Sequence, residues 1–380
     1  MNTELTNQGA SADGSNPIIV TFTNSKRQYT INSNGTIEYA GVKSGEDIVT
    51  STDIYTAVCV DGENETLLFS NNKKAIEDYL EDNNTTLANG YDEIENITGD
   101  IYFDNYDEEN DVESYKMPRW CGYNPDDDWN STEYAEKITK VQFLNTIFPQ
   151  NTAYWFMGLT NLTTLENISN LNTINVVSME CMFSDCSSLS TLNVSNFDTS
   201  NVTTMQGMFA GCSSLSNLNV SNFDTTNVIN MGAMFSGCSG LLTLNVSNFN
   251  TTKVTSMWSL FEGCSSLTSL DVTDFNTSNV TSINSMFMGC SSLVSLDLSN
   301  FNTSNVVNME SLFTSCSNLT TIYVSDTFVV ATEVPNDSVL FSGCTLLIGG
   351  NGTRYNAYYI YKAYAHIDGG ASNPGYFTAK

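Results

Sequence analysis

A repeat of 26 residues between Val176 and Leu319 constrains the fold more than any other feature of the sequence. Phenylalanines from Phe183 to Phe313 and leucines from Leu189 to Leu319 recur at this step without slippage. The cysteines that keep it are Cys186, Cys212, Cys238, Cys264, Cys290 and Cys316. A fixed period of this length indicates stacked supersecondary units rather than one globular core.

One unit divides into two apolar segments separated by turns. Residues 192–195 alternate apolar and polar side chains, which predicts a short strand. Residues 198–201, Asp-Thr-Ser-Asn, favour a turn. The following apolar positions predict one side of a short helix or helical turn, and they are Val202, Met205, Met208 and Phe209. Gly211 then suits a residue with positive φ after that turn.

A single unit cannot bury its own apolar faces, whereas stacked units cover one another. Strands of neighbouring units would lie about 4.8 Å apart in a parallel sheet. The sequence therefore predicts an α/β solenoid, with a parallel β-sheet on one face and short helical turns on the other.

The motifs L-x-x-L-x-V and M-x-x-M-F-x-G-C resemble the 26-residue repeat of bacterial BspA-like leucine-rich-repeat surface proteins. The resemblance covers roughly residues 118–380. The departures are Ile283, Leu260 and Leu312 in place of methionine, and Lys253 in place of asparagine. The resemblance implies a right-handed leucine-rich-repeat stack, a cell-surface or secreted protein, and a role in adhesion or interaction.

The segment before the repeats predicts a small β-rich domain. Asn34-Gly35 separates one pair of strands, and residues 54–60 and 66–70 form a second pair. Residues 73–80 predict a short helix, and residues 100–103 a strand. The first pair resembles the strand end of a prepilin-like domain. The predicted organisation is a flexible tail (1–16), a β-rich domain (17–117), an N-terminal cap with a degenerate first repeat (118–175), 26-residue repeats (176–344) and a C-terminal cap (345–380).

Large aromatic residues mark both caps, because the ends of a solenoid must cover an otherwise open apolar face. Trp120 and Trp155 precede the repeats, with Leu165 in the degenerate first coil. After the repeats, the chain is rich in tyrosine from Tyr355 to Tyr364. Stacking on sugars is the alternative role for these tyrosines.

Composition excludes several functional classes. The net charge of −29 over 380 residues disfavours nucleic acid and anionic membranes. No apolar run approaches the roughly 20 residues of a membrane span, and the N-terminus lacks the pattern of a signal peptide. His366 is the single histidine, so we expect neither histidine-dependent catalysis nor a multi-histidine metal site, and no enzyme activity.

Cysteine spacing argues against a disulfide framework. The six column cysteines would stack as small apolar groups with parallel side chains, which is poor geometry for a disulfide bond. We expect reduced structural thiols and no cofactor. The acidic run Asp104–Glu113 leaves Ca²⁺ binding open as an alternative to a solvated loop, although it lacks the spacing of a Ca²⁺ loop.

Two surfaces are candidates for interaction. The strand side presents small polar columns, including one made of Asn193, Asn219, Asn245, Asp271 and Asp297. On the other side Trp258 interrupts a polar or small column, with Met288 about one coil further on. Trp258 is either exposed for contact or folded over a neighbouring coil.

We expect a monomeric, non-catalytic surface or secreted protein. Its partners would be a host matrix protein, a bacterial surface component or a glycan. The alternatives are a structural pilin-like or surface-fibre component, and a carbohydrate-binding accessory module.

Overall fold

The fold is described from a computed structural model. It covers the backbone of the first five strands and residues 53–61, 64–88, 93–97, 118, 120 and 135–380. The chain forms two compact units, Met1–Asp53 and Ile54–Lys380. The predicted segment 17–117 is thus shared between both units, and the acidic run Asp104–Glu113 and the strand expected at 100–103 lie outside the described residues.

The first unit is an antiparallel five-stranded sheet in the order β1-β2-β3-β4-β5. One strand was expected before Asn34-Gly35, but the structure has two there, β2 and β3, which pair with each other. β3 pairs antiparallel with β4, as predicted for the strands on either side of Asn34-Gly35, and Asn34-Gly35 itself lies outside the described residues. The bounds are Leu5–Gln8 (β1), Ile18–Phe22 (β2), Arg27–Ile31 (β3), Ile37–Ser44 (β4) and Asp47–Val49 (β5).

The second unit begins with a five-stranded sheet in the order β10-β9-β7-β6-β8. The hairpin of β6 and β7 and the helix α1 lie where the sequence predicts them. Parallel pairing of β7 with β9 and of β9 with β10 joins this hairpin to the first coils of the repeat region. The bounds are Tyr55–Asp61 (β6), Asn64–Ser70 (β7), Lys73–Asp82 (α1), Glu95–Asn96 (β8), Ile138–Phe143 (β9) and Thr164–Glu166 (β10).

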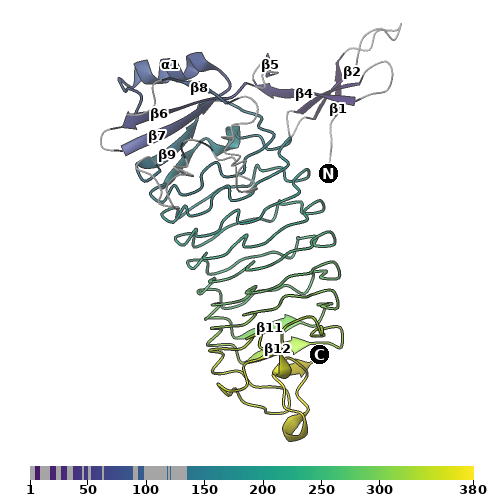
Figure 1. The fold of residues 1–380 in the computed structure, drawn as a ribbon. Coiled ribbons are helices and arrows are strands. Elements are labelled where there is room, and N and C mark those ends of the chain that lie inside the picture. Colours follow the sequence, from purple (N-terminus) through teal and green to yellow (C-terminus); the bar gives the residue numbers. More distant parts are fainter. Residues whose placement is uncertain are drawn as a thin grey trace, which may run out of the picture. The chain divides into compact units, whose positions relative to one another are not determined.

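Successive coils stack from β9 to the C-terminus, as Figure 1 shows. Isolated parallel bridges connect equivalent residues 26 positions apart, from Ser178 to Thr204 and onward to Asn308. The coils end in a three-stranded sheet of β11 (Ser295–Leu298), β12 (Thr321–Val324) and β13 (Phe377–Ala379). Short 3-10 turns occupy Ile168–Asn170, Lys362–Tyr364 and Gly370–Ser372.

A short helix or a helical turn was expected for each M-x-x-M-F-x-G-C segment. The segments form linked turns and not a short helix. Between Leu171 and Tyr361, all of which the structure describes, there is no helix. Alternate N–H groups from Met205 to Gly211 donate to the next coil at 2.7–3.0 Å, and those between them close turns within the coil. Gly211 has φ 70°, which confirms the expected positive φ.

Coil-to-coil pairing on the L-x-x-L-x-V side is concentrated at the two ends of the stack. There it joins β9 to β10, and β11 to β12 and β13. Between residues 189 and 274, a fully described range, the one bridge on this side is Asn217 to Thr243. The continuous ladder therefore lies on the side where helical turns were expected, and the leucine-rich-repeat type of the solenoid stays a prediction.

A column of stacked phenylalanine rings forms the centre of the core. Ring centroids are 5.9 Å apart for Phe183 and Phe209, 5.8 Å for Phe209 and Phe235, and 5.9 Å for Phe235 and Phe261. The column continues to Phe341 although the sequence spacing lengthens after Cys316. Each ring is covered by the coil on either side, as stacked units require.

Buried threonines join the coils where backbone pairing is absent. The Thr225 hydroxyl donates to the Asn250 carbonyl at 3.1 Å and accepts from the Asn250 N–H at 2.7 Å. One hydroxyl thereby satisfies both backbone groups of a residue in the next coil. The same arrangement involves Thr173, Thr199, Thr251 and Thr277. From the sequence, this position was predicted only to lie in a turn.

An asparagine column supplies further contacts between coils, and Asp274 interrupts it. Nδ2 of Asn222 donates to two carbonyls of the preceding coil, at 3.0 and 2.9 Å. Asn196 and Asn248 do the same, but a carboxylate at Asp274 has no hydrogen to donate.

Asp274→Asn is therefore expected to raise the free energy of unfolding by about 1 kcal/mol, the net worth of a typical hydrogen bond. Denaturant unfolding measures the change. Asp224→Asn is the matched control, because Asp224 accepts a local bond from Thr226 N–H and faces no such carbonyl pair. Equal stabilisation by both variants would show that relief of negative charge, and not the new amide, is the cause.

Both ends of the stack are closed by aromatic side chains. Trp120 and Trp155 are fully buried against Phe69, with ring centroids 5.5 and 5.0 Å away, and Trp120 Nε1 donates to the Trp155 carbonyl. At the other end, Tyr376 packs on Phe341 at 5.1 Å. These contacts exclude water from the first and last phenylalanines of the column.

Candidate functional site

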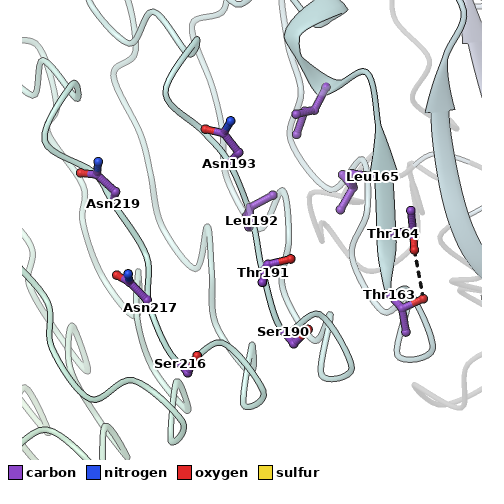
Figure 2. Close-up of a pocket in the computed structure, with 11 residues that line it drawn as sticks. Thr163, Thr164, Leu165, Ser190, Thr191, Leu192, Asn193, Ser216, Asn217 and Asn219 are labelled. Carbon is purple, nitrogen blue, oxygen red and sulfur yellow. Dashed lines mark hydrogen bonds between the residues drawn. The ribbon is translucent and has the colours of Figure 1, made fainter.

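An open groove of ≈ 570 Å³ lies on the strand side of the first three coils. Figure 2 shows its side chains arranged in successive rows, one row for each coil. Thr163, Thr164, Leu165 and Ile168 line it from the first coil. The next two coils contribute Ser190, Thr191, Leu192 and Asn193, and then Ser216, Asn217 and Asn219. The groove therefore includes two of the asparagines proposed from the sequence.

The groove opens where two neighbouring coils lose their contact. On one side of the opening, Ser188 N–H donates to the Thr160 carbonyl at 3.1 Å. On the other side, Asn196 Nδ2 donates to the Ile168 and Leu171 carbonyls at 3.3 and 3.0 Å. Between these points no hydrogen bond joins the two coils, all residues of which the structure describes.

The asparagine column has a different geometry from the one expected. Oδ1 of Asn193, Asn219 and Asn245 accepts the N–H of the residue two positions later, at 3.0–3.1 Å, instead of bonding along the stack. These local turns hold each side chain in place. In residues 135–380 the exposed Nδ2 groups have no partner, so the column presents oriented hydrogen-bond donors.

Asp271 and Asp297, in the same column, lie outside the groove and are already engaged. The Thr273 hydroxyl and N–H donate to Asp271 and lower the pKa of its carboxyl group. Lys380 forms an ion pair with Asp297. Desolvation opposes the bonds from Lys380 and Ser299, which nevertheless keep the pKa of Asp297 lowered. The repeat predicts that the five positions form one column, but in the structure only Asn193 and Asn219 of this column line the groove.

Trp258 folds over the neighbouring coil, which is one of the two placements considered from the sequence. A Cβ on Gly232 would lie 2.2 Å from Trp258 Nε1, so the indole covers this glycine. Trp258 is half-buried, and so is Met288 in the next coil. The missing side chain at Gly232 thus provides the space that Trp258 occupies.

Gly232→Ala is expected to displace the indole and shift the Trp258 fluorescence to longer wavelength, because the ring must leave its covered position. Emission spectra of the folded protein measure the shift. The same substitution in a Trp258→Phe background is the control and should leave the emission unchanged. An unchanged spectrum in the original background would mean that Trp258 does not rest on Gly232.

The cysteine column is built into the core. The thiol of Cys238 donates to the Phe209 carbonyl of the preceding coil at 3.1 Å, and burial raises its pKa to about 12. Equivalent bonds are made by Cys186, Cys212, Cys264, Cys290, Cys316 and Cys344. A protonated, buried thiol is a poor nucleophile, so these cysteines have a structural role.

The tyrosines of the C-terminal segment divide into packing and exposed groups. Tyr364 packs on Tyr376 and Tyr359, with centroids 5.8 and 4.6 Å away, whereas Tyr358 is 84% exposed. Asp368 lies buried beneath this segment and accepts bonds from several N–H groups and from the Thr353 hydroxyl. The hydrogen bonds to Asp368 thus hold the C-terminal segment together.

In the described ranges, no three His, Cys, Asp or Glu side chains are grouped closely enough to hold a metal ion. No helix in those ranges has both the length and the apolar character needed to cross a bilayer. The groove residues not predicted from the sequence include Thr163 and Thr164, which belong to a degenerate repeat, and Ser190 and Ser216 of the next two coils. Leu165 was assigned in that degenerate repeat only to packing.

A protein-family model matches the chain in two overlapping segments, residues 130–243 and 240–345. Together they cover more than half of the 380 residues. Comparison with curated proteins and with solved structures gave no match. The family match is compatible with the resemblance to BspA-like repeats and does not itself establish the leucine-rich-repeat type. The chain belongs to the bacterial family described as "Mycoplasma protein of unknown function, DUF285".

Proposed function

We propose that this protein is a non-catalytic surface or secreted interaction protein of the leucine-rich-repeat type that binds its partner through the strand-side groove. The observation that carries the proposal is the chemistry of that groove. Its described lining residues carry amides, hydroxyls and aliphatic side chains and no charged group, within a chain of net charge −29. A concave site with a few oriented polar groups is the usual form of a binding site.

Two further features support binding over catalysis. In the part of the chain that the structure describes, the groove contains no acid, base or nucleophilic thiol that is activated for reaction. The oriented Nδ2 groups of Asn193 and Asn219 offer hydrogen bonds that the fold itself does not use. Proteins and glycans both present acceptors for such donors, and both remain within the proposal.

The location rests on the resemblance of the repeat to BspA-like surface proteins. The runner-up function is a structural surface-fibre component, which would act by self-association. The groove favours a binding protein, because a fibre subunit needs complementary contacts between copies and not an unoccupied polar site.

A binding screen of the full chain against host matrix proteins, glycans and bacterial cells tests the proposal. The variant Asn193→Leu/Asn219→Leu removes the two oriented Nδ2 donors that this column contributes to the groove. Asn245→Leu is the matched control, since it makes the same change in the same column outside the groove.

Saturable binding that is lost in the double variant and kept in Asn245→Leu is the expected result. Binding that survives in the double variant would place the site elsewhere and contradict the proposal. Absence of binding together with self-association of the full chain would favour the fibre component.

A further inference from the structure

The groove contains a run of extended backbone with no hydrogen-bond partner. In residues 190–193 no backbone N–H or C=O group bonds to another described residue. The segment is exposed at Ser190, Thr191 and Asn193, so solvent can reach these backbone groups. A ligand that carries its own donors and acceptors in an extended arrangement can replace that solvent.

The opposite side of the groove is the edge of a sheet. β10 is the terminal strand of the order β10-β9-β7-β6-β8 and pairs only with β9 among the described strands. Its outer edge faces the unpaired segment 190–193 across the groove. An unpaired strand edge is a template for the addition of another strand.

Side chains in the groove suit a backbone ligand. Thr164, Thr191 and Ser190 are small enough to let a chain approach closely. Leu165, Ile168 and Leu192 form an aliphatic floor that can receive one apolar side chain. Among the described residues, no aromatic ring lines the groove, so they offer no stacking platform of the kind that usually holds a sugar.

Charge restricts the ligand further. A charged side chain inside the groove would have no opposite charge to pair with there. Outside it, the net charge of −29 attracts positively charged segments and repels acidic ones. The ligand is therefore uncharged in its centre and basic at its flanks.

We propose that the groove binds an extended peptide segment, uncharged at its centre and flanked by Lys or Arg, which pairs as an added strand with the outer edge of β10. Strand addition draws affinity from main-chain hydrogen bonds and specificity from alternate side-chain pockets. This inference rests on the proposed function, since it names the partner of the same groove.

The test uses the full chain and an array of blocked hexapeptides with Lys at both ends and four varied uncharged residues between. Peptides that bind are resynthesised with N-methyl groups at alternate amides, which removes backbone donors and leaves the side chains. Thr191→Phe fills the groove at an exposed position, and Thr243→Phe is its control in the same column outside the groove.

We expect at least one peptide to bind. N-methylation of every second amide can start at the first or the second amide, and in one of these two forms we expect at least tenfold weaker affinity. We expect a similar loss for Thr191→Phe and none for Thr243→Phe. Equal affinity of all N-methylated and unmodified peptides would overturn strand addition.

If no peptide binds but a neutral glycan does, and Thr191→Phe abolishes its binding, the peptide inference is overturned and the proposed function is kept. Binding of neither class by the groove would overturn both.

Discussion

Replacing Phe235 by alanine is expected to lower the free energy of unfolding by about 3–5 kcal/mol, the usual cost of truncating a buried phenylalanine. Phe235 is fully buried, and its ring stacks on Phe209 and Phe261 at 5.8 and 5.9 Å. The coils above and below are held at their spacing by backbone bonds, so they cannot close the cavity.

Denaturant unfolding of the full chain measures the loss. The control is Leu242→Ala, because Leu242 lies seven positions later and is 60% exposed. Its substitution is expected to change stability by no more than about 0.5 kcal/mol. A Phe235→Ala protein as stable as the original would mean that the phenylalanine column is not the core of the stack.

The second large effect is expected at Asp368, where Asp368→Asn should lower the free energy of unfolding by at least about 3 kcal/mol. The buried carboxylate accepts the N–H groups of Asn351, Thr353 and Gly370 and the Thr353 hydroxyl, at 2.7–3.0 Å. An amide removes the charge and points two hydrogens at these donors, which leaves some of them buried and unpaired.

The same carboxylate makes the stability of the C-terminal cap depend on pH. Desolvation opposes the hydrogen bonds from Thr353, Gly370 and Asn351, but these bonds prevail and hold the pKa of Asp368 far below its usual range. An unfolded aspartate titrates near pH 3.9. The contribution of Asp368 is therefore complete above about pH 4 and is lost as the pH falls below that value.

Thermal unfolding at pH 7 and at pH 3 measures both effects, and the difference between the original protein and Asp368→Asn should narrow at the lower pH. Asp326→Asn is the control, because Asp326 is exposed in the last coil. A difference that is the same at both pH values would mean that the charge of Asp368 is not what holds the cap.

The sequence alone determined the repeat and the residues that face the core. Its period places equivalent side chains in columns, and apolar columns must be buried whichever backbone pairing holds the coils. The residues predicted to face inward, from Phe183 to Leu319, are accordingly buried, except Leu192, which is half-buried and lines the groove. Local signals also sufficed for the β6–β7 hairpin and for α1.

Only the tertiary structure decided which side of the coil carries the continuous ladder. Both apolar segments are compatible with extended or turn backbone, and the choice depends on the partner that each N–H finds in the next coil. For the same reason Thr225, read as a turn residue, became a connection between coils.

The groove likewise depends on contacts between residues far apart in the sequence. The repeat assigns the same outward position to Asn193, Asn219 and Asn245, yet only the first two line the groove. β10 is held by β9 and the hairpin before it, and the following coil is not paired with β10. A periodic sequence specifies equivalent positions, and the ends of the stack make those positions unequal because each end has a different neighbour.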